Sequence, residues 1–191
     1  SMDKLLEIIT IQPASENRAK PLVKPKGVIV ALHGWGSNAK DLAALAPVLN
    51  LPDYLMLFPQ APFAHPSVGD GRMWYDFQNP NSNQLQTSRN LLKAYLQSVL
   101  TSQTTDIPIF LLGFSQGGAM TLDFALEPLI ANNANEGYLA GFICLSGYLH
   151  PDRQTAKSQT AITSSVLIIH GTKDPVVPII AAQSAKITLA K

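Results

Sequence analysis

The sequence has few charged residues, a single cysteine and no long hydrophobic run. Charged residues make up 14% of the 191 residues and hydrophobic residues 46%, a balance that excludes an intrinsically disordered chain. The formal net charge of +1 gives no electrostatic basis for binding nucleic acid or an anionic membrane surface. The lone Cys144 excludes an internal disulfide and a cysteine-ligated zinc site, and its apolar neighbours predict a buried, inert thiol.

No apolar run approaches the ~18 residues that a membrane-spanning helix needs. The N-terminus also lacks the apolar stretch of a secretory signal. These absences favour a cytoplasmic protein without a membrane span. A chain of 191 residues suits one compact domain, which we place over residues 1–191.

Short apolar runs alternate with helical patterns, which predicts an α/β fold with a mostly parallel central sheet and helices on both faces. The expected strands cover 5–11, 27–32, 54–58, 107–112, 138–145 and 165–169. The expected helices cover 38–49, 88–100, 116–126 and 178–191. Between them, 60–83 is rich in Pro, Gly, Asn and Asp and predicts a long functional loop, whereas 151–163 predicts an exposed polar linker.

The most specific chemical pattern is Gly113-x-Ser115-x-Gly117, which follows an apolar strand and precedes a helix. A nucleophile elbow needs this context, because small residues around the serine allow a tight turn that presents its hydroxyl above the sheet. The hydroxyl then lies at a helix N-terminus, where a developing anion is favoured. The pattern predicts that Ser115 is a catalytic nucleophile; the alternative is a Gly-Ser turn that only redirects the chain.

A second pattern, His-Gly-Trp-Gly at 33–36, directly follows the strand expected at 27–32. Acyl transfer passes through a tetrahedral oxyanion, which two preorganised backbone N–H groups stabilise. We assign these groups to Gln116, the residue after the nucleophile, and to Trp35, whose glycine neighbours let the backbone approach a substrate. His33 is interpreted as shaping this loop rather than as the general base.

A third pattern places Asp174 on a turn after the strand expected at 165–169. In proteins with a nucleophile elbow the catalytic groups follow in the order serine, acid, histidine. Asp174 therefore fits the acid that orients an imidazole, the alternative being a structural turn aspartate. His170 is interpreted as structural, and Asp123 and Asp152 compete weakly because neither follows a late strand.

Together these patterns resemble the acyl-protein thioesterase / carboxylesterase family of α/β-hydrolases, also described as phospholipase/carboxylesterases. The resemblance covers the chain from residue 24 to the end. Besides the three patterns above, the segments 58–62, 74–76, 145–149 and 170–178 carry it. It implies hydrolysis of small carboxylic esters, lysophospholipids or S-acylated cysteines without a metal or organic cofactor. The family's nucleophile matches Ser115 and its acid Asp174. Its oxyanion donors match Trp35 and Gln116, and the loop that carries Trp74 borders the substrate pocket.

One part of the family pattern is absent. The family's histidine follows the acid, whereas all four histidines here precede Asp174: His33, His65, His150 and His170. We therefore expect that the chain as given lacks a last strand and helix together with this histidine. An uncovered sheet edge of that kind favours a homodimer.

Two functional interpretations remain. The first is a hydrolase that acts on a small-molecule ester or acyl-thioester through an acyl-enzyme, with the base absent or replaced by a residue such as His65. The second is a catalytically impaired or non-catalytic binding protein that keeps the fold. The intact patterns around Ser115, Trp35 and Asp174 favour the first.

Overall fold

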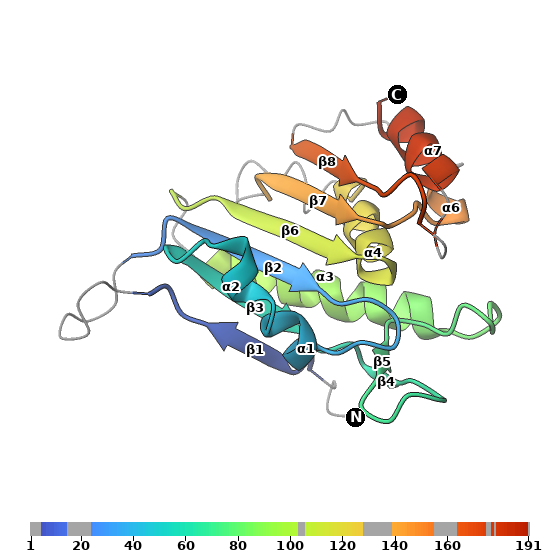
Figure 1. Ribbon diagram of the computed structural model, residues 1–191, viewed down its shortest axis with the longest axis horizontal. Helices are drawn as coiled ribbons and strands as arrows, with labels where there is room; N and C mark the ends of the chain where they lie inside the picture. The colour runs from blue at the N-terminus through green and yellow to red at the C-terminus, as the bar shows by residue number, and fades with distance from the viewer. Residues whose placement is uncertain are drawn as a thin grey trace.

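The computed structural model describes residues 5–14, 24–102, 106–127, 139–154, 164–174, 177 and 179–190. Its main strands are β1 (Ile8–Ile11), β2 (Gly27–Leu32), β3 (Tyr54–Pro59), β6 (Ile109–Phe114), β7 (Gly141–Leu145) and β8 (Ser165–Ile169). They form one six-stranded sheet in the order β1-β3-β2-β6-β7-β8 (Figure 1). Neighbouring strands are parallel except β1 and β3, so the expected mostly parallel sheet is confirmed.

Helices cover both faces of the sheet, as expected. On one face lie α1 (Ala39–Ala43) and α2 (Ala46–Leu49); on the other lie α3 (Gln84–Ser102) and α4 (Gln116–Ala125) (Figure 1). The central strand β2 is buried along its whole length and sends alternate side chains into the two core clusters. This double burial explains why its sequence is continuously apolar rather than alternating.

A smaller third cluster joins α4 and β7 to α7 (Ile179–Leu189), near the short helix α6 (Pro151–Gln154). It contains Cys144, which is fully buried, and burial raises the pKa of its thiol to about 11. The thiol is therefore protonated and inert at neutral pH, as the sequence predicts. Strand β8 forms the edge of the described sheet, and its Leu167 and Ile169 side chains are 52% and 51% exposed.

The expected helix over 38–49 is wrong in one respect, because two short helices occupy it. Asn38 caps α1 by accepting a hydrogen bond from Asp41 N at 2.8 Å. Pro47 lies in the first turn of α2, where its missing N–H costs least, so the proline starts a new helix instead of continuing the old one.

The long loop over 60–83 is present but carries a small hairpin of β4 (Phe63–Ala64) and β5 (Arg72–Met73). The expected linker over 151–163 begins as α6, and its remainder from 155 to 163 lies outside the described residues, as does Tyr138. Within the described ranges, none of the helices is long and apolar enough to cross a membrane.

Candidate active site

Ser115 occupies a sharp turn between β6 and α4. Its backbone has φ 51° and ψ −112°, a conformation that residues with a side chain rarely adopt. Two backbone hydrogen bonds hold it there: Ser115 N donates to Leu145 O at 2.8 Å, and Ala119 N donates to Ser115 O at 3.0 Å. A strained serine held by neighbouring strands and helix is the geometry of a nucleophile elbow.

The two glycines of the pattern are required by backbone packing. A Cβ on Gly113 would lie 2.1 Å from Gly117 O, and a Cβ on Gly117 would lie 2.3 Å from Leu32 O. Both contacts are with backbone atoms, which cannot rotate away. The absence of these two side chains lets the first turn of α4 pack directly on the end of β2.

Ser115 lines a cavity of about 920 Å³ at the carboxyl ends of the strands. Trp35, Gln116 and Asp174 line the same cavity, although they come from three widely separated parts of the sequence. The structure therefore brings together the nucleophile, the two assigned oxyanion residues and the acid that the sequence singles out. The carboxyl ends of parallel strands are where open α/β sheets place their ligands.

The loop after β2 lies directly against the elbow. A Cβ on Gly34 would lie 3.3 Å from Phe114 O and 3.5 Å from Ser115 Cβ. Trp35 follows Gly34 and reaches the cavity from this side, whereas Gln116 begins α4. The loop after β2 and the start of α4 thus lie beside the serine, and the assignment of Trp35 and Gln116 to an oxyanion hole stays a prediction.

The Gln116 side chain has a separate task. It is 2% exposed, its Oε1 accepts from Trp74 N at 2.8 Å, and its Nε2 donates to Tyr75 O at 2.7 Å. One amide thus fastens the loop after β5 to the N-terminal end of α4. The conformation of that loop is consequently coupled to the position of Ser115.

Trp74 lies behind the cavity wall. Its indole is fully buried, donates from Nε1 to His33 O at 2.8 Å and stacks on the His33 ring at a centroid distance of 5.4 Å. In the part of the chain that the structure describes, the residues of this loop that line the cavity include Tyr75 and Phe77 but not Trp74. The loop borders the cavity, and Trp74 supports it from within.

Asp174 lies on the turn that follows β8. Its Oδ1 accepts from Val177 N at 2.9 Å, and its Oδ2 lies 3.8 Å from His170 Nε2. His170 Nε2 also lies 2.6 Å from Val177 O, to which it donates. His170 thus holds the turn that carries Asp174, in agreement with a structural role.

Two other histidines also have structural environments. His33 is 1% exposed; its Nε2 accepts from Ala61 N at 3.0 Å and its Nδ1 donates to Gly34 O at 2.9 Å. Burial lowers the pKa of His33 to about 4, so its ring is neutral. His65 Nδ1 accepts two backbone N–H groups at 3.0 Å each, and its ring packs on Trp35 at a centroid distance of 3.9 Å.

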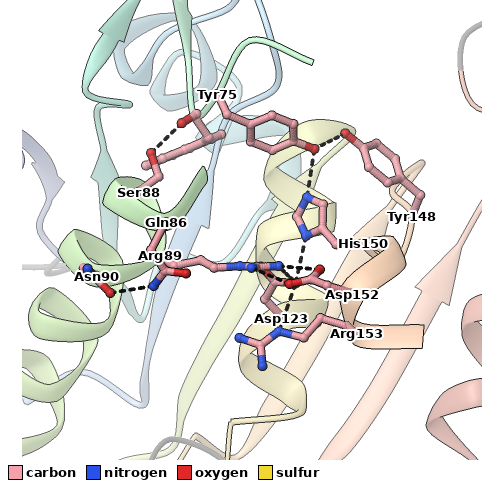
Figure 2. A network of polar contacts seen from close by, with 11 residues as sticks. Tyr75, Gln86, Ser88, Arg89, Asn90, Asp123, Tyr148, His150, Asp152 and Arg153 are labelled. Atoms are coloured by element: carbon pink, nitrogen blue, oxygen red, sulfur yellow. Dashed lines mark hydrogen bonds and ion pairs between the residues drawn. The ribbon is translucent and has the colours of Figure 1, made fainter. Parts of the chain in front are cut away.

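Sequence reasoning assigned no role to His150, yet this histidine lines the cavity with Ser115. Its Nδ1 lies 2.8 Å from Asp123 Oδ1, and its Nε2 lies 2.8 Å from Tyr75 Oη (Figure 2). Asp123, a weak competitor for the acid, is thus paired with a histidine of its own. Across the described ranges, no group of three or more His, Cys, Asp or Glu is arranged to hold a metal ion.

Known proteins match both the sequence and this geometry. Residues 16–191 match the profile of the phospholipase/carboxylesterase family. Acyl-protein thioesterase 1 of Kluyveromyces lactis is 28% identical over 179 residues, covering 84% of this chain and 75% of that protein. The crystal structure of esterase PE8 superimposes with a TM-score of 0.77 at 27% identity, covering 98% of this chain and 84% of the other.

A second solved structure supports the fold. Zea mays acyl-protein thioesterase 2 gives a TM-score of 0.71 at 24% identity, over 96% of this chain and 84% of that one. The parallel sheet, the elbow and these likenesses define an α/β-hydrolase. Within that class, the chain belongs to the phospholipase/carboxylesterase family and is a hydrolase of the esterase and thioesterase type.

Burial of His33 predicts a pH dependence of stability. The folded protein resists protonation of His33 until about pH 4, whereas the unfolded chain takes up the proton near the ordinary pKa of 6.5. Stability from this group is therefore complete above pH 6.5 and is lost as the pH falls toward 4. Relative to a His33→Gln variant, the free energy of unfolding should fall by about 3 kcal/mol between pH 7.5 and pH 4. Urea unfolding measures it, and an equal difference at both pH values would contradict the prediction.

The packing at the elbow predicts that Gly117→Ala destabilises the protein. Alanine ordinarily stabilises a helix by about 1 kcal/mol over glycine, but here its methyl group would overlap Leu32 O. We expect a net loss of about 3 kcal/mol in thermal or urea unfolding. Gly69→Ala is the matched control, since a Cβ there meets no atom within 4 Å. Equal stability of the two variants would show that the elbow tolerates a side chain.

Proposed function

We propose that this protein is a serine hydrolase that cleaves carboxylic esters or thioesters through an acyl-enzyme at Ser115. The observation that carries the proposal is the strained Ser115 backbone, which presents the hydroxyl to a cavity also lined by Trp35 and Asp174. Strain at one serine inside a family of esterases is the expected cost of an exposed nucleophile. The thioesterase and esterase relatives support the bond class.

The proposed reaction proceeds in two halves. Ser115 Oγ attacks the substrate carbonyl, and the Trp35 and Gln116 backbone N–H groups donate to the oxygen that becomes negatively charged. The alcohol or thiol leaves with a proton and the acyl group stays on Ser115. Water then attacks this ester and releases the carboxylic acid. The N-terminus of α4 adds a favourable potential at the oxyanion.

The Ser115 proton needs a base, and we propose that Asp174 orients an imidazole for this purpose. The hydrogen bond from Val177 N holds the Asp174 carboxylate at the cavity. No histidine follows Asp174 in the sequence, and both ring nitrogens of His150 already have partners. We therefore assign the base to none of the four histidines of residues 1–191.

The acyl chain is proposed to lie against the apolar part of the cavity. The walls there are formed by side chains of several elements, namely Trp35, Phe77, Pro80, Leu85, Val177 and Ala181. A volume of about 920 Å³ lies at the upper end of the range for small-molecule sites, which accommodates a medium-length acyl group. Burial of methylene groups against these side chains supplies about 0.8 kcal/mol each.

Covalent labelling tests the nucleophile, with free imidazole added to the buffer as an external base for the Ser115 proton. A fluorophosphonate probe should modify Ser115 of the 191-residue chain, and peptide mass spectrometry should place the label on that residue. Ser115→Ala should abolish labelling. Ser146→Ala is the matched control: Ser146 also lines the cavity and also has a positive φ, of 53°, yet that variant should still be labelled at Ser115.

Turnover of p-nitrophenyl acetate tests the base separately. With none of the four histidines acting as the base and no imidazole added, we expect only residual hydrolysis, because the oxyanion donors and substrate binding act alone. Ser115-dependent turnover at ordinary enzymatic rates would show that a group of this chain acts as the base. A folded chain that shows no label at Ser115 even with added imidazole, and no turnover, would overturn the nucleophile and favour a binding protein.

A further inference from the structure

A continuous chain of polar side chains runs from the protein interior to the cavity beside Ser115 (Figure 2). Arg89 of α3 donates to both carboxylate oxygens of Asp123, at 2.7 Å from Nε and 3.3 Å from Nη2. Asp123 contacts His150 Nδ1 at 2.8 Å, and His150 Nε2 contacts Tyr75 Oη at 2.8 Å. Tyr75 Oη is in turn hydrogen-bonded to Tyr148 Oη, and both tyrosines line the cavity.

The charges around His150 balance when its ring is neutral. Asp123 is held by Arg89, and Arg153 Nε lies 3.7 Å from its Oδ1. Asp152 accepts two further hydrogen bonds from Arg89, at 2.7 Å from Nη1 and 3.0 Å from Nη2. Two carboxylates thus meet two guanidinium groups around the 3% exposed His150, and a neutral ring keeps this balance.

A neutral His150 fixes the direction of every hydrogen bond in the chain. Since a carboxylate only accepts, Nδ1 carries the ring proton and donates to Asp123, which leaves Nε2 as an acceptor. Tyr75 therefore donates to Nε2, and its oxygen accepts the proton of Tyr148. Burial raises the pKa of both phenols, so neither tyrosine loses its proton at neutral pH. Because the Tyr148 proton is used in this bond, the Tyr148 oxygen can only accept a hydrogen bond from a group in the cavity.

The sheet order places Tyr148 on the leaving-group side of the nucleophile. Trp35 follows β2, Ser115 follows β6, Tyr148 follows β7 and Asp174 follows β8, and these strands are consecutive neighbours. The imidazole that Asp174 orients must protonate the departing alcohol. The alcohol therefore lies toward β7 and β8, away from the oxyanion donor Trp35.

We propose that the Tyr148 hydroxyl oxygen is a fixed hydrogen-bond acceptor that makes this hydrolase prefer esters whose alcohol portion carries a further hydroxyl group. The inference rests on the proposed function. A hydroxyl on the alcohol donates to Tyr148 Oη, whereas an ether oxygen at the same place finds no donor there. Because the walls are largely apolar, an acceptor without a donor at this place discriminates between the two groups.

Binding to an inactive protein tests this preference apart from catalysis. The Ser115→Ala variant is titrated with 2-hydroxyethyl octanoate and 2-methoxyethyl octanoate, which differ by one methyl group and by the capacity to donate. Tryptophan fluorescence reports occupancy, since Trp35 lines the cavity. One neutral hydrogen bond predicts about threefold to tenfold tighter binding of the hydroxyl compound.

A second substitution, made in the same variant, assigns the preference to Tyr148. Tyr148→Phe should reduce the affinity ratio of the two esters to one or below, because the methoxy compound is the more apolar. Tyr95→Phe is the matched control: Tyr95 belongs to α3, packs against the core and is not among the cavity-lining residues of the described chain, so the ratio should persist. Circular dichroism confirms that each variant is folded.

His150→Phe tests the direction of the hydrogen bonds. It keeps an aromatic ring beside Tyr75 and Tyr148 but removes the acceptor for the Tyr75 proton. The Tyr148 proton is then free to turn toward the cavity, so the preference for the hydroxyl compound should disappear although Tyr148 is present.

Equal binding of the two esters, or a preference that survives Tyr148→Phe, would overturn the inference. A preference that survives His150→Phe would overturn the fixed direction on which it depends. Failure of the proposed function has a different signature, namely the absence of a fluorophosphonate label at Ser115 in the unaltered protein when imidazole is supplied as the base. The two failures are therefore separable.

Discussion

The site depends on one packing contact, the direct approach of the first turn of α4 to the backbone of β2. Gly117 lies so near Leu32 O that not even a methyl group fits between them, and Gly113 lies equally near Gly117. Ser115, which lies between these two glycines, has a positive φ. Strain of that kind costs about 1–3 kcal/mol and persists only when the surrounding structure fixes it. Here the fixing groups are the parallel strands, whose hydrogen bonding continues beyond β6 through Ser115 N to Leu145 O.

A second group of contacts couples the elbow to the cavity wall. Gln116 binds Trp74 N and Tyr75 O through its amide, so the residue next to the nucleophile also positions the loop opposite it. The Tyr75 side chain is held at its other end by His150. The Tyr75 backbone is thus held by Gln116 and the Tyr75 side chain by His150. Such fixing from two independent segments is what a preorganised binding wall requires.

The ion pairs behind this wall are buried, so their contribution to stability depends on every partner being present. Asp123 is 1% exposed and has hydrogen bonds from Arg89 and His150 in place of water. A buried pair of this kind contributes little net stability, but removal of one partner costs about 3–5 kcal/mol because the other charge remains buried. The cluster is better explained as a device that fixes orientation than as a source of stability.

The sequence predicted those features that depend on neighbouring residues. The strands over 27–32 and 165–169 match β2 and β8 because apolar runs with flanking turns are local signals. The grouping of Ser115, Trp35, Gln116 and Asp174 at one cavity follows from parallel strands whose carboxyl ends share one edge. The position of Trp74 could not be read in this way, because alternate residues of a loop point inward and outward without a fixed period. The partners of His150, Asp123 and Tyr75, lie 27 and 75 residues away in the sequence, so no local pattern predicts these contacts.

The order of strands also arranges the chemistry in space. Moving across the sheet from β2 to β8, the strand ends carry in turn the assigned oxyanion donor Trp35, the proposed nucleophile Ser115, a hydrogen-bonding wall and the proposed acid Asp174. Neighbouring strand ends are about one strand spacing apart, near 5 Å. In the proposed reaction, a substrate carbonyl centred over β6 therefore has its oxygen on one side and its leaving group on the other. The polarity of the wall after β7 then bears on the alcohol rather than on the oxyanion, which links substrate selection to the topology of the sheet.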